Sequence, residues 1–213
     1  MAKPEMTRPT SAQTGDKRMA YRDKLVRNLQ TSIAAKQQFL LRADQLDNFD
    51  RAVQTVVRGY RHGGRLYIAG NGGSAADAQH LAAEFVGRLG TRERPSLPAE
   101  ALTTDSSTLT AISNDYGYDE VFARQVAGKM RSPDIFLGIT TSGNSPNILR
   151  ALEQCRAMAL ISIVFCGRDG GRALQLADHC IIANGDATST IQELHIVLAH
   201  SLCECVEEEF AGQ

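Results

Sequence analysis

The chain alternates short apolar runs with amphipathic stretches along most of its length. Uninterrupted apolar runs are typical of strands in a parallel sheet that is covered on both faces. They predict strands over residues 65–69, 99–103, 134–140, 160–165 and 179–183. Apolar residues at helical spacing predict helices over 74–89, 106–112, 119–130, 146–157 and 190–210. Two further amphipathic stretches, 21–41 and 46–60, precede the first strand.

This order of elements predicts an α/β fold. We expect a doubly wound three-layer sandwich around a five-stranded, mainly parallel sheet, with additional N-terminal helices. Residues 1–18 are polar and lack the apolar core of a signal sequence, so they are predicted to be a disordered tail before a single domain over 19–213. In such sheets, ligands bind beyond the carboxyl ends of the strands.

Two strands end in turns of the same kind. Residues 70–74 read Gly-Asn-Gly-Gly-Ser, and residues 141–145 read Thr-Ser-Gly-Asn-Ser. Each turn opens a predicted helix, where small residues let backbone N–H groups approach a ligand and the helix dipole favours negative charge. Two such turns at one sheet edge indicate a phosphorylated ligand, although each could also be only a tight connection.

The first turn also fits a dinucleotide fingerprint, Gly70-x-Gly72-x-x-Ala75. That site needs an acidic residue at the end of the next strand. The candidate, Glu93, lies in an Arg/Pro-rich loop with no strand before it, and the turn has no phosphate-binding lysine. A sugar phosphate that is held by hydroxyl and amide groups is the better interpretation.

The composition limits which binding partners and which cellular compartment are expected for this protein. A formal net charge of -1 gives no reason to expect nucleic acid or an acidic membrane surface as a partner. No apolar run approaches the length of a membrane span. The five cysteines lie in apolar segments, which fits reduced thiols in a cytoplasmic protein.

The helix after the first turn carries a candidate pair for metal binding. His80 and Glu84 are four residues apart and share a helix face, which suits two ligands of one metal ion. Spacing alone favours the alternative, an exposed ion pair on a solvated face. The Ala and Leu residues around the pair indicate instead that this helix is covered.

The last predicted helix carries a second polar pair. Gln192 and His200 lie about 80° apart around its axis, so both can reach one site. The alternative for His200 is a buried histidine with a satisfied hydrogen bond. His195 is assigned a structural role. Cys203 and Cys205 are assigned to the core, because alternate positions on a helix do not converge.

Five motifs in order carry a family resemblance. They are Gly-Asn-Gly-Gly-Ser-Ala-Ala-Asp-Ala-Gln-His at 70–80 with Glu84, Ser-Asn-Asp-Tyr-Gly at 113–117, Thr-Thr-Ser-Gly-Asn-Ser at 140–145, Gly-Arg-Asp-Gly-Gly at 167–171, and Ile-Gln-Glu-x-His-x-x-x-x-His at 191–200. From about residue 21 to 210 the chain resembles sugar isomerase (SIS) domain proteins, and more narrowly the phosphoheptose isomerase family.

The resemblance implies a site and an assembly. It implies zinc, one ion per subunit, and homotetramers whose sites lie at subunit contacts. The implied zinc ligands are His80, Glu84, Gln192 and His200. Of these, Glu84 and His200 match the acid/base pair. The implied substrate-binding residues are Asn71, Gly72, Gly73, Ser74, Glu84, Asn114, Asp115, Thr140, Thr141, Ser142, Ser145 and Gln192.

The implied activity is an aldose–ketose isomerisation. It converts sedoheptulose 7-phosphate to D-glycero-D-manno-heptose 7-phosphate through an enediol(ate), toward nucleotide-activated heptose for lipopolysaccharide or related glycans. The alternative is a non-catalytic SIS scaffold that binds the replication initiator DnaA. Such scaffolds lack the residues that match Glu84 and His200, and this chain has both. A sugar-phosphate-sensing regulator would need a DNA-binding domain, for which the chain has no spare length.

The chain departs from the family pattern at two site positions. Thr140 stands where the family usually has serine, which keeps a hydroxyl. Thr190 stands where a basic residue is usual, which puts the details of substrate binding at this loop in question.

Overall fold

In the computed structural model, which describes residues 11–212 and the side chains of residues 20–212, the sheet has five strands. They are β1 (Leu66–Gly70), β2 (Ala99–Ala101), β3 (Ile135–Thr140), β4 (Ile161–Gly167) and β5 (His179–Ala183). The strand order is β2-β1-β3-β4-β5, and every neighbouring pair is parallel. The predicted α/β class is confirmed, and the sheet is parallel throughout.

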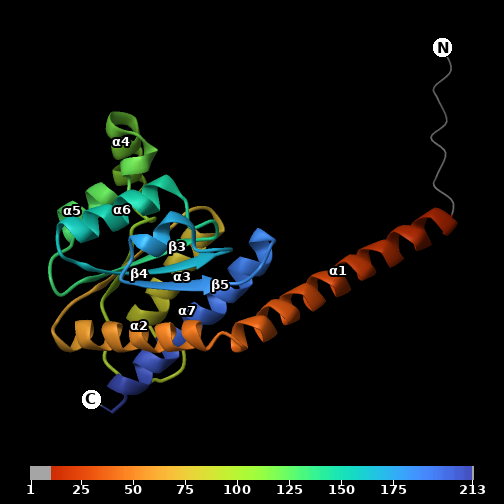
Figure 1. Ribbon diagram of the computed structural model, residues 1–213, viewed down its shortest axis with the longest axis horizontal. Helices are drawn as coiled ribbons and strands as arrows, with labels where there is room; N and C mark the ends of the chain where they lie inside the picture. The colour runs from red at the N-terminus through yellow and green to blue at the C-terminus, as the bar shows by residue number, and fades with distance from the viewer. Residues whose placement is uncertain (1–10, 213) are drawn as a thin grey trace.

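Helices precede, connect and follow the strands (Figure 1). They are α1 (Ser11–Leu40), α2 (Ala43–Arg61), α3 (Gly73–Val86), α4 (Ser106–Tyr116), α5 (Ala123–Lys129), α6 (Pro146–Ala157) and α7 (Thr188–Phe210), with short 3-10 helices η1 (Tyr118–Glu120) and η2 (Gly171–Gln175). The helix predicted over 119–130 is divided between η1 and α5.

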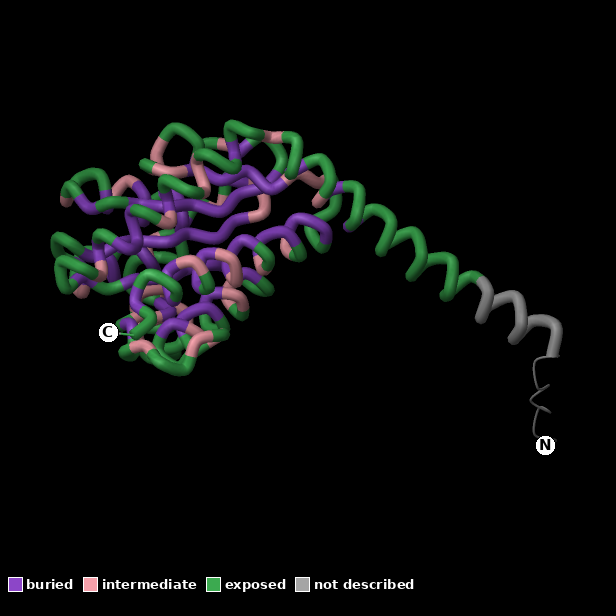
Figure 2. Tube along the Cα trace, turned by 90° about the horizontal axis from the view of Figure 1, so that it is seen from below, coloured by how far each residue is buried: buried purple, intermediate pink, exposed green. Residues whose placement is uncertain are grey.

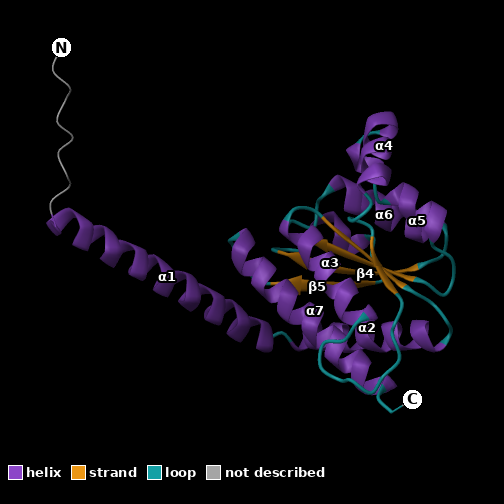
Figure 3. Ribbon diagram, turned by 180° about the vertical axis from the view of Figure 1, so that it is seen from behind, coloured by secondary structure: helices purple, strands orange, loops and turns teal. Residues whose placement is uncertain are grey.

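The sheet is buried between two helical layers. Figure 3 shows α5 and α6 on one side and α2 and α7 on the other. Alternate side chains of one strand enter different cores: Ile68 packs with the α2–α3–α7 side, whereas Tyr67 packs with the α5–α6 side. This explains the uninterrupted apolar runs, since both faces of each central strand are covered.

α1 extends away from this sandwich (Figures 1 and 2). Among its described side chains, from residue 20 on, Ala35 and Phe39 near its end are buried, whereas Leu25, Leu29 and Ile33 are more than half exposed. Of the predicted disordered tail, residues 1–10 lie outside the described residues, and residues 11–18 are helical as the start of α1. No helix in residues 11–212 is both long and apolar enough to cross a membrane.

The topology brings the two predicted turns together. β1 and β3 are neighbours and parallel, with Gly70 paired to Ile139, so both strands end at the same edge of the sheet. We name residues 70–74 the glycine turn and residues 140–145 the hydroxyl turn. The site expected beyond the carboxyl ends of the strands lies where these two turns meet.

Candidate active site

The glycine turn leads directly into α3. Gly72 is the N-cap of α3 with a φ of 57°, a conformation that favours glycine. No side chain caps this helix, and its first turn contains no acidic residue. A Cβ on Gly73 would lie 2.5 Å from Nε2 of Gln192, so the absence of a side chain lets α7 approach the start of α3. The N–H groups of Ser74 and Ala75 pair with the carbonyls of Asn71 and Gly72, so what this end offers an anion is the helix dipole.

The hydroxyl turn is held by its own polar groups. Thr140 Oγ1 and Ser145 Oγ are 2.9 Å apart, and the Asn144 N–H donates to Ser142 Oγ at 3.1 Å. Gly143 has a φ of 67°, and a Cβ there would lie 2.1 Å from the Gly170 carbonyl oxygen. Ser145 is the N-cap of α6, but its side chain makes no cap hydrogen bond. This helix start also fits an anion.

A pair of amides joins the two turns. Asn71 Nδ2 donates to Asn147 Oδ1 at 2.9 Å, and Asn147 Nδ2 donates back to Asn71 Oδ1 at 2.8 Å. Tyr118 Oη also donates to Asn71 Oδ1 at 3.1 Å. Sequence reasoning missed both Asn147 and Tyr118. A polar residue two positions after the hydroxyl turn was the available signal for Asn147, which is buried.

α3 carries His80 and Glu84 and α7 carries Gln192 and His200, the side chains predicted as metal ligands; we name these four residues the histidine cluster. Three of them lie together, whereas Gln192 lies against Gly73 at the start of α3. His80 Nε2 lies 3.1 Å from Glu84 Oε1, and the His80 and His200 rings are 5.1 Å apart, edge to face. Nε2 of His200 is buried and has no hydrogen-bond partner. His80 therefore lies between the carboxylate and the second imidazole.

Asp77, one turn before His80, is a carboxylate that sequence reasoning missed. Burial raises its pKa, and the nearby His80 and His200 partly oppose this shift. The Asp77 carboxyl group therefore lies within electrostatic reach of both imidazoles.

The side chains of the histidine cluster are not arranged as a complete metal-binding site. Among residues 20–212, no three His, Cys, Asp or Glu side chains are arranged so that together they hold an ion. The donor types do fit zinc, which accepts imidazole and carboxylate ligands. The unpartnered Nε2 of His200 also fits, because buried polar atoms normally have a partner. Zinc stays a prediction.

α4 does not bring its predicted residues to this cluster. Asn114 and Asp115 are exposed, and Asn114 Nδ2 donates to Asp115 Oδ1 at 2.8 Å. Figure 1 shows α4 standing out from the sandwich on the side of α5 and α6. Substrate binding by Asn114 and Asp115 therefore stays a prediction.

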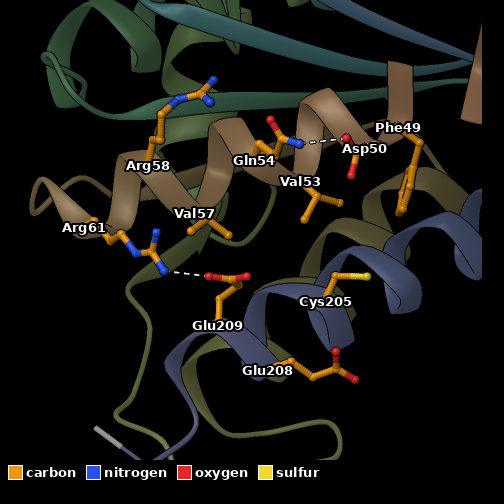
Figure 4. A pocket seen from close by; sticks show the side chains of 10 residues that line it. All are labelled: Phe49, Asp50, Val53, Gln54, Val57, Arg58, Arg61, Cys205, Glu208 and Glu209. Carbon is orange, nitrogen blue, oxygen red and sulfur yellow. Dashed lines mark hydrogen bonds and ion pairs between the residues drawn. The ribbon is translucent and has the colours of Figure 1, made fainter. Parts of the chain in front are cut away.

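The three residues predicted to be structural, His195, Cys203 and Cys205, are not equally buried. His195 is fully buried, its Nε2 pairs with the Cys166 carbonyl at 3.0 Å, and burial lowers its pKa to about 4. Cys203 is buried in the core as predicted. Cys205 is only partly buried, because it lines a groove of about 660 Å³ between α2 and α7 (Figure 4). This groove does not include the histidine cluster.

The similarity of the chain to known proteins agrees with this fold. The five-stranded parallel sheet with helices on both faces defines a three-layer α/β domain, and the model of the SIS domain family matches residues 29–167. Phosphoheptose isomerase 2 of Campylobacter jejuni is 48% identical over 182 residues, 85% of this chain and 90% of that protein. Phosphoheptose isomerase of Aneurinibacillus thermoaerophilus is 45% identical over 186 residues, 87% and 93% of the two chains.

Solved structures agree with the sequence comparison. Phosphoheptose isomerase GmhA from Neisseria gonorrhoeae has a TM-score of 0.82 at 37% identity, covering 88% of this chain and 99% of that one. The enzyme from Francisella tularensis has a TM-score of 0.83 at 34% identity, covering 88% and 98%. The chain belongs to the phosphoheptose isomerases of the SIS domain family.

Proposed function

We propose that the protein converts sedoheptulose 7-phosphate to D-glycero-D-manno-heptose 7-phosphate through an enediolate, with Glu84 and His200 as the acid/base pair. Family membership over more than four-fifths of the chain supports the reaction. The observation that carries the assignment of residues is the packing of α3 on α7, which sets His80 and Glu84 beside His200. The relatives named above are isomerases, and nothing in them favours a DnaA-binding scaffold.

The two turns hold the phosphate end and the sugar chain. The hydroxyl turn presents four side-chain hydroxyls at the start of α6, where the helix dipole favours phosphate. The glycine turn, with Asn71 fixed by Asn147, lies beside it and faces the histidine cluster through Gly73 and Gln192. Anchoring the phosphate in this way holds the C1–C2 end against the cluster, which converts proton transfer to an intramolecular step.

The isomerisation moves a proton between C1 and C2. One of Glu84 and His200 removes the proton from carbon, and the other transfers protons at the sugar oxygens. The pair needs opposed positions, and the packing of α3 on α7, with the His80 and His200 rings 5.1 Å apart, supports this part of the proposal. The negative oxygen of the enediolate also needs a positive or hydrogen-bonding partner.

Zinc is the proposed metal of the histidine cluster. His80, Glu84, Gln192 and His200 would hold the ion, and zinc when bound supplies a Lewis acid for the substrate oxygens. His80 Nε2 and Glu84 Oε1, which are 3.1 Å apart, would both be ligands of the ion. It would give the buried Nε2 of His200 the partner that it lacks.

A homotetramer with sites at subunit contacts is also part of this proposal. The exposed apolar residues of α1 support assembly, since Leu25, Leu29 and Ile33 lie at helical spacing on the part of α1 that leaves the sandwich. Assembly would also give the projecting α4 a neighbouring site to which it can present Asn114 and Asp115. We place the enzyme in the cytoplasm, at the start of nucleotide-activated heptose synthesis.

The direct test is incubation of the purified protein with sedoheptulose 7-phosphate in D2O, with and without a chelator. NMR should show deuterium entering at C1 or C2 and the aldose product accumulating, with both processes lost after chelation. Turnover that survives complete metal removal would refute zinc but keep the reaction. Absence of exchange and product in metal-loaded protein would refute the reaction itself.

A further inference from the structure

A buried ion pair ties together α3, the loop that follows it, and α7. The Arg94 and Glu207 side chains are each 1% exposed, and Arg94 Nη2 lies 2.7 Å from Glu207 Oε1. Arg94 Nε donates to the same oxygen at 2.9 Å. We name this pair the Arg94–Glu207 clamp. Such a pair is tolerated in a protein interior only when its remaining polar atoms also find partners.

The Glu207 carboxylate is saturated with backbone donors. Its Oε1 accepts from the Leu89 N–H at 2.9 Å, and its Oε2 accepts from Gly90 and Thr91 at 2.9 and 3.1 Å. Burial alone raises the pKa of Glu207, but these bonds together with Arg94 outweigh it and lower the pKa to about 2. The carboxylate therefore stays charged and fixes the loop to α7.

The Arg94 guanidinium closes the end of α3. Its Nη2 donates to the Glu84 carbonyl at 2.7 Å, and its Nη1 donates to the Phe85 carbonyl at 2.9 Å. The last carbonyls of a helix lack partners within the helix, and a cation at this end is favourable. α3 has no basic residue in its own last turn, so Arg94 supplies that cation from outside the helix.

The clamp acts on the two helices that carry the histidine cluster. On α3 it binds the backbone of Glu84 itself. On α7, Glu207 follows His200 by seven residues, which places both on one face about two turns apart. We infer that Arg94 and Glu207 are positioning residues that set α3 against α7 and thereby hold Glu84 opposite His200. This inference rests on the proposed acid/base roles of Glu84 and His200.

A positioning role differs from a purely structural one in what its loss changes. If the clamp sets the distance between the acid and the base, its loss lowers kcat, since small displacements of catalytic groups are costly. It leaves KM nearly unchanged, because the phosphate is held at the hydroxyl turn, and the hydrogen bonds of the clamp do not involve that turn. A purely structural role lowers thermal stability alone.

The test compares Arg94→Lys and Glu207→Gln with Asp134→Asn. Asp134 is also a buried carboxylate, and it accepts the N–H groups of Arg65 and Arg131 at 2.9 Å each. It lies just before β3, and the residues that it bonds belong to neither α3 nor α7. All three variants are assayed at a temperature where circular dichroism shows each to be folded.

Arg94→Lys keeps the charge opposite Glu207 but cannot reach both carbonyls of α3 while it pairs with the carboxylate. We expect kcat to fall about tenfold with KM within about twofold, whereas Asp134→Asn loses thermal stability and keeps kcat. Equal kcat in Arg94→Lys and Asp134→Asn would overturn the inference. A rise in KM with unchanged kcat would overturn it as well.

A second readout does not depend on turnover. In NMR spectra of the metal-free wild-type protein and variants, Arg94→Lys should shift the imidazole resonances of His80 and His200, and Asp134→Asn should leave them in place. Unshifted resonances in Arg94→Lys would contradict the positioning role. If the wild-type protein proves inactive on sedoheptulose 7-phosphate, the proposed function fails, while these spectra still decide whether the clamp positions the two histidines.

Discussion

The hydroxyl turn and the histidine cluster are built differently. In the hydroxyl turn, Thr140, Ser142 and Ser145 all have hydrogen-bond partners within the turn, and Gly143 packs on the Gly170 carbonyl. In the histidine cluster, Nε2 of His200 has no partner, and His80 pairs only with Glu84 among the cluster's other side chains. The polar groups of the first region are paired with one another, and the second region contains a buried ring nitrogen without a hydrogen-bond partner.

The difference follows from how each region is encoded. The hydroxyl turn is formed by six consecutive residues, so its geometry depends on local backbone conformation and on one contact with the Gly170 turn. The histidine cluster depends on how two helices pack, and its ligands are separated by more than a hundred residues in sequence. Phosphate binding is therefore expected to need little rearrangement, whereas the reacting end needs a bound ligand to become complete.

The largest effect is expected from the acid/base pair. Glu84→Gln and His200→Gln each keep the size of the side chain but remove its proton-transfer chemistry, so kcat should fall by about 10²–10⁴-fold. Steady-state kinetics on folded protein measures this. His195→Gln is the matched control on α7, because His195 serves the core through the Cys166 carbonyl. Near wild-type rates in either Glu84→Gln or His200→Gln would contradict the acid/base assignment.

Zinc binding and its loss test whether the histidine cluster is the region that a bound metal ion completes. Zinc at about 1,000 times its Kd should stabilise the native state by about 4 kcal/mol, which raises Tm. His80→Ala should lose most of this gain and its zinc content, as measured by scanning calorimetry and elemental analysis. The same zinc content in His80→Ala as in the wild-type protein would show that the ion binds elsewhere.

Lowering the pH tests how His195 and Glu207 contribute to the free energy of unfolding, in two separate pH ranges. The pKa of His195 is lowered from 6.5 to about 4, so the stability from its neutral form is present above pH 6.5 and is lost as pH falls toward 4. The pKa of Glu207 is lowered from 4.5 to about 2, so its contribution is lost between these values as pH falls. Each shift corresponds to about 3 kcal/mol.

Urea denaturation as a function of pH measures both contributions. His195→Gln should flatten the stability curve between pH 6.5 and 4, and Glu207→Gln should flatten it below pH 4.5. If Glu207→Gln leaves the acid limb of the curve unchanged, the carboxylate does not have the hydrogen bonds described here. His195→Gln thus reports on the contact of α7 with β4, and Glu207→Gln reports on the contact of α7 with the loop after α3.

Much of this architecture follows from local sequence patterns. Apolar runs predict all five strands, and the spacing of His80 and Glu84 places them on one face of α3. The pairing of that face with His200 depends on helix packing, so here the family resemblance supplied what periodicity could not. The Arg94–Glu207 clamp spans 113 residues, and the amide pair of Asn71 and Asn147 spans 76. Contacts over such distances are set by topology, which local patterns do not encode.

The smallest effect is expected in the hydroxyl turn. Ser145→Ala removes one hydroxyl from a turn that stays folded, because Gly143 and Asn144 still contact the Gly170–Arg172 segment. One lost hydrogen bond to a charged phosphate is worth about 1.5–3 kcal/mol, so KM should rise at least tenfold. The value of kcat should stay within about twofold, since the histidine cluster is untouched.

The matched control for this substitution is Ser162→Ala on β4. Ser162 is also buried, and its hydroxyl donates to Asp178 at 3.1 Å, away from both turns. It should change stability and leave KM as it is. If Ser145→Ala lowers kcat as strongly as it raises KM, the phosphate end and the reacting end are coupled. The hydroxyl turn would then not be the independent, preformed half of the site, because binding there would also be needed to complete the histidine cluster.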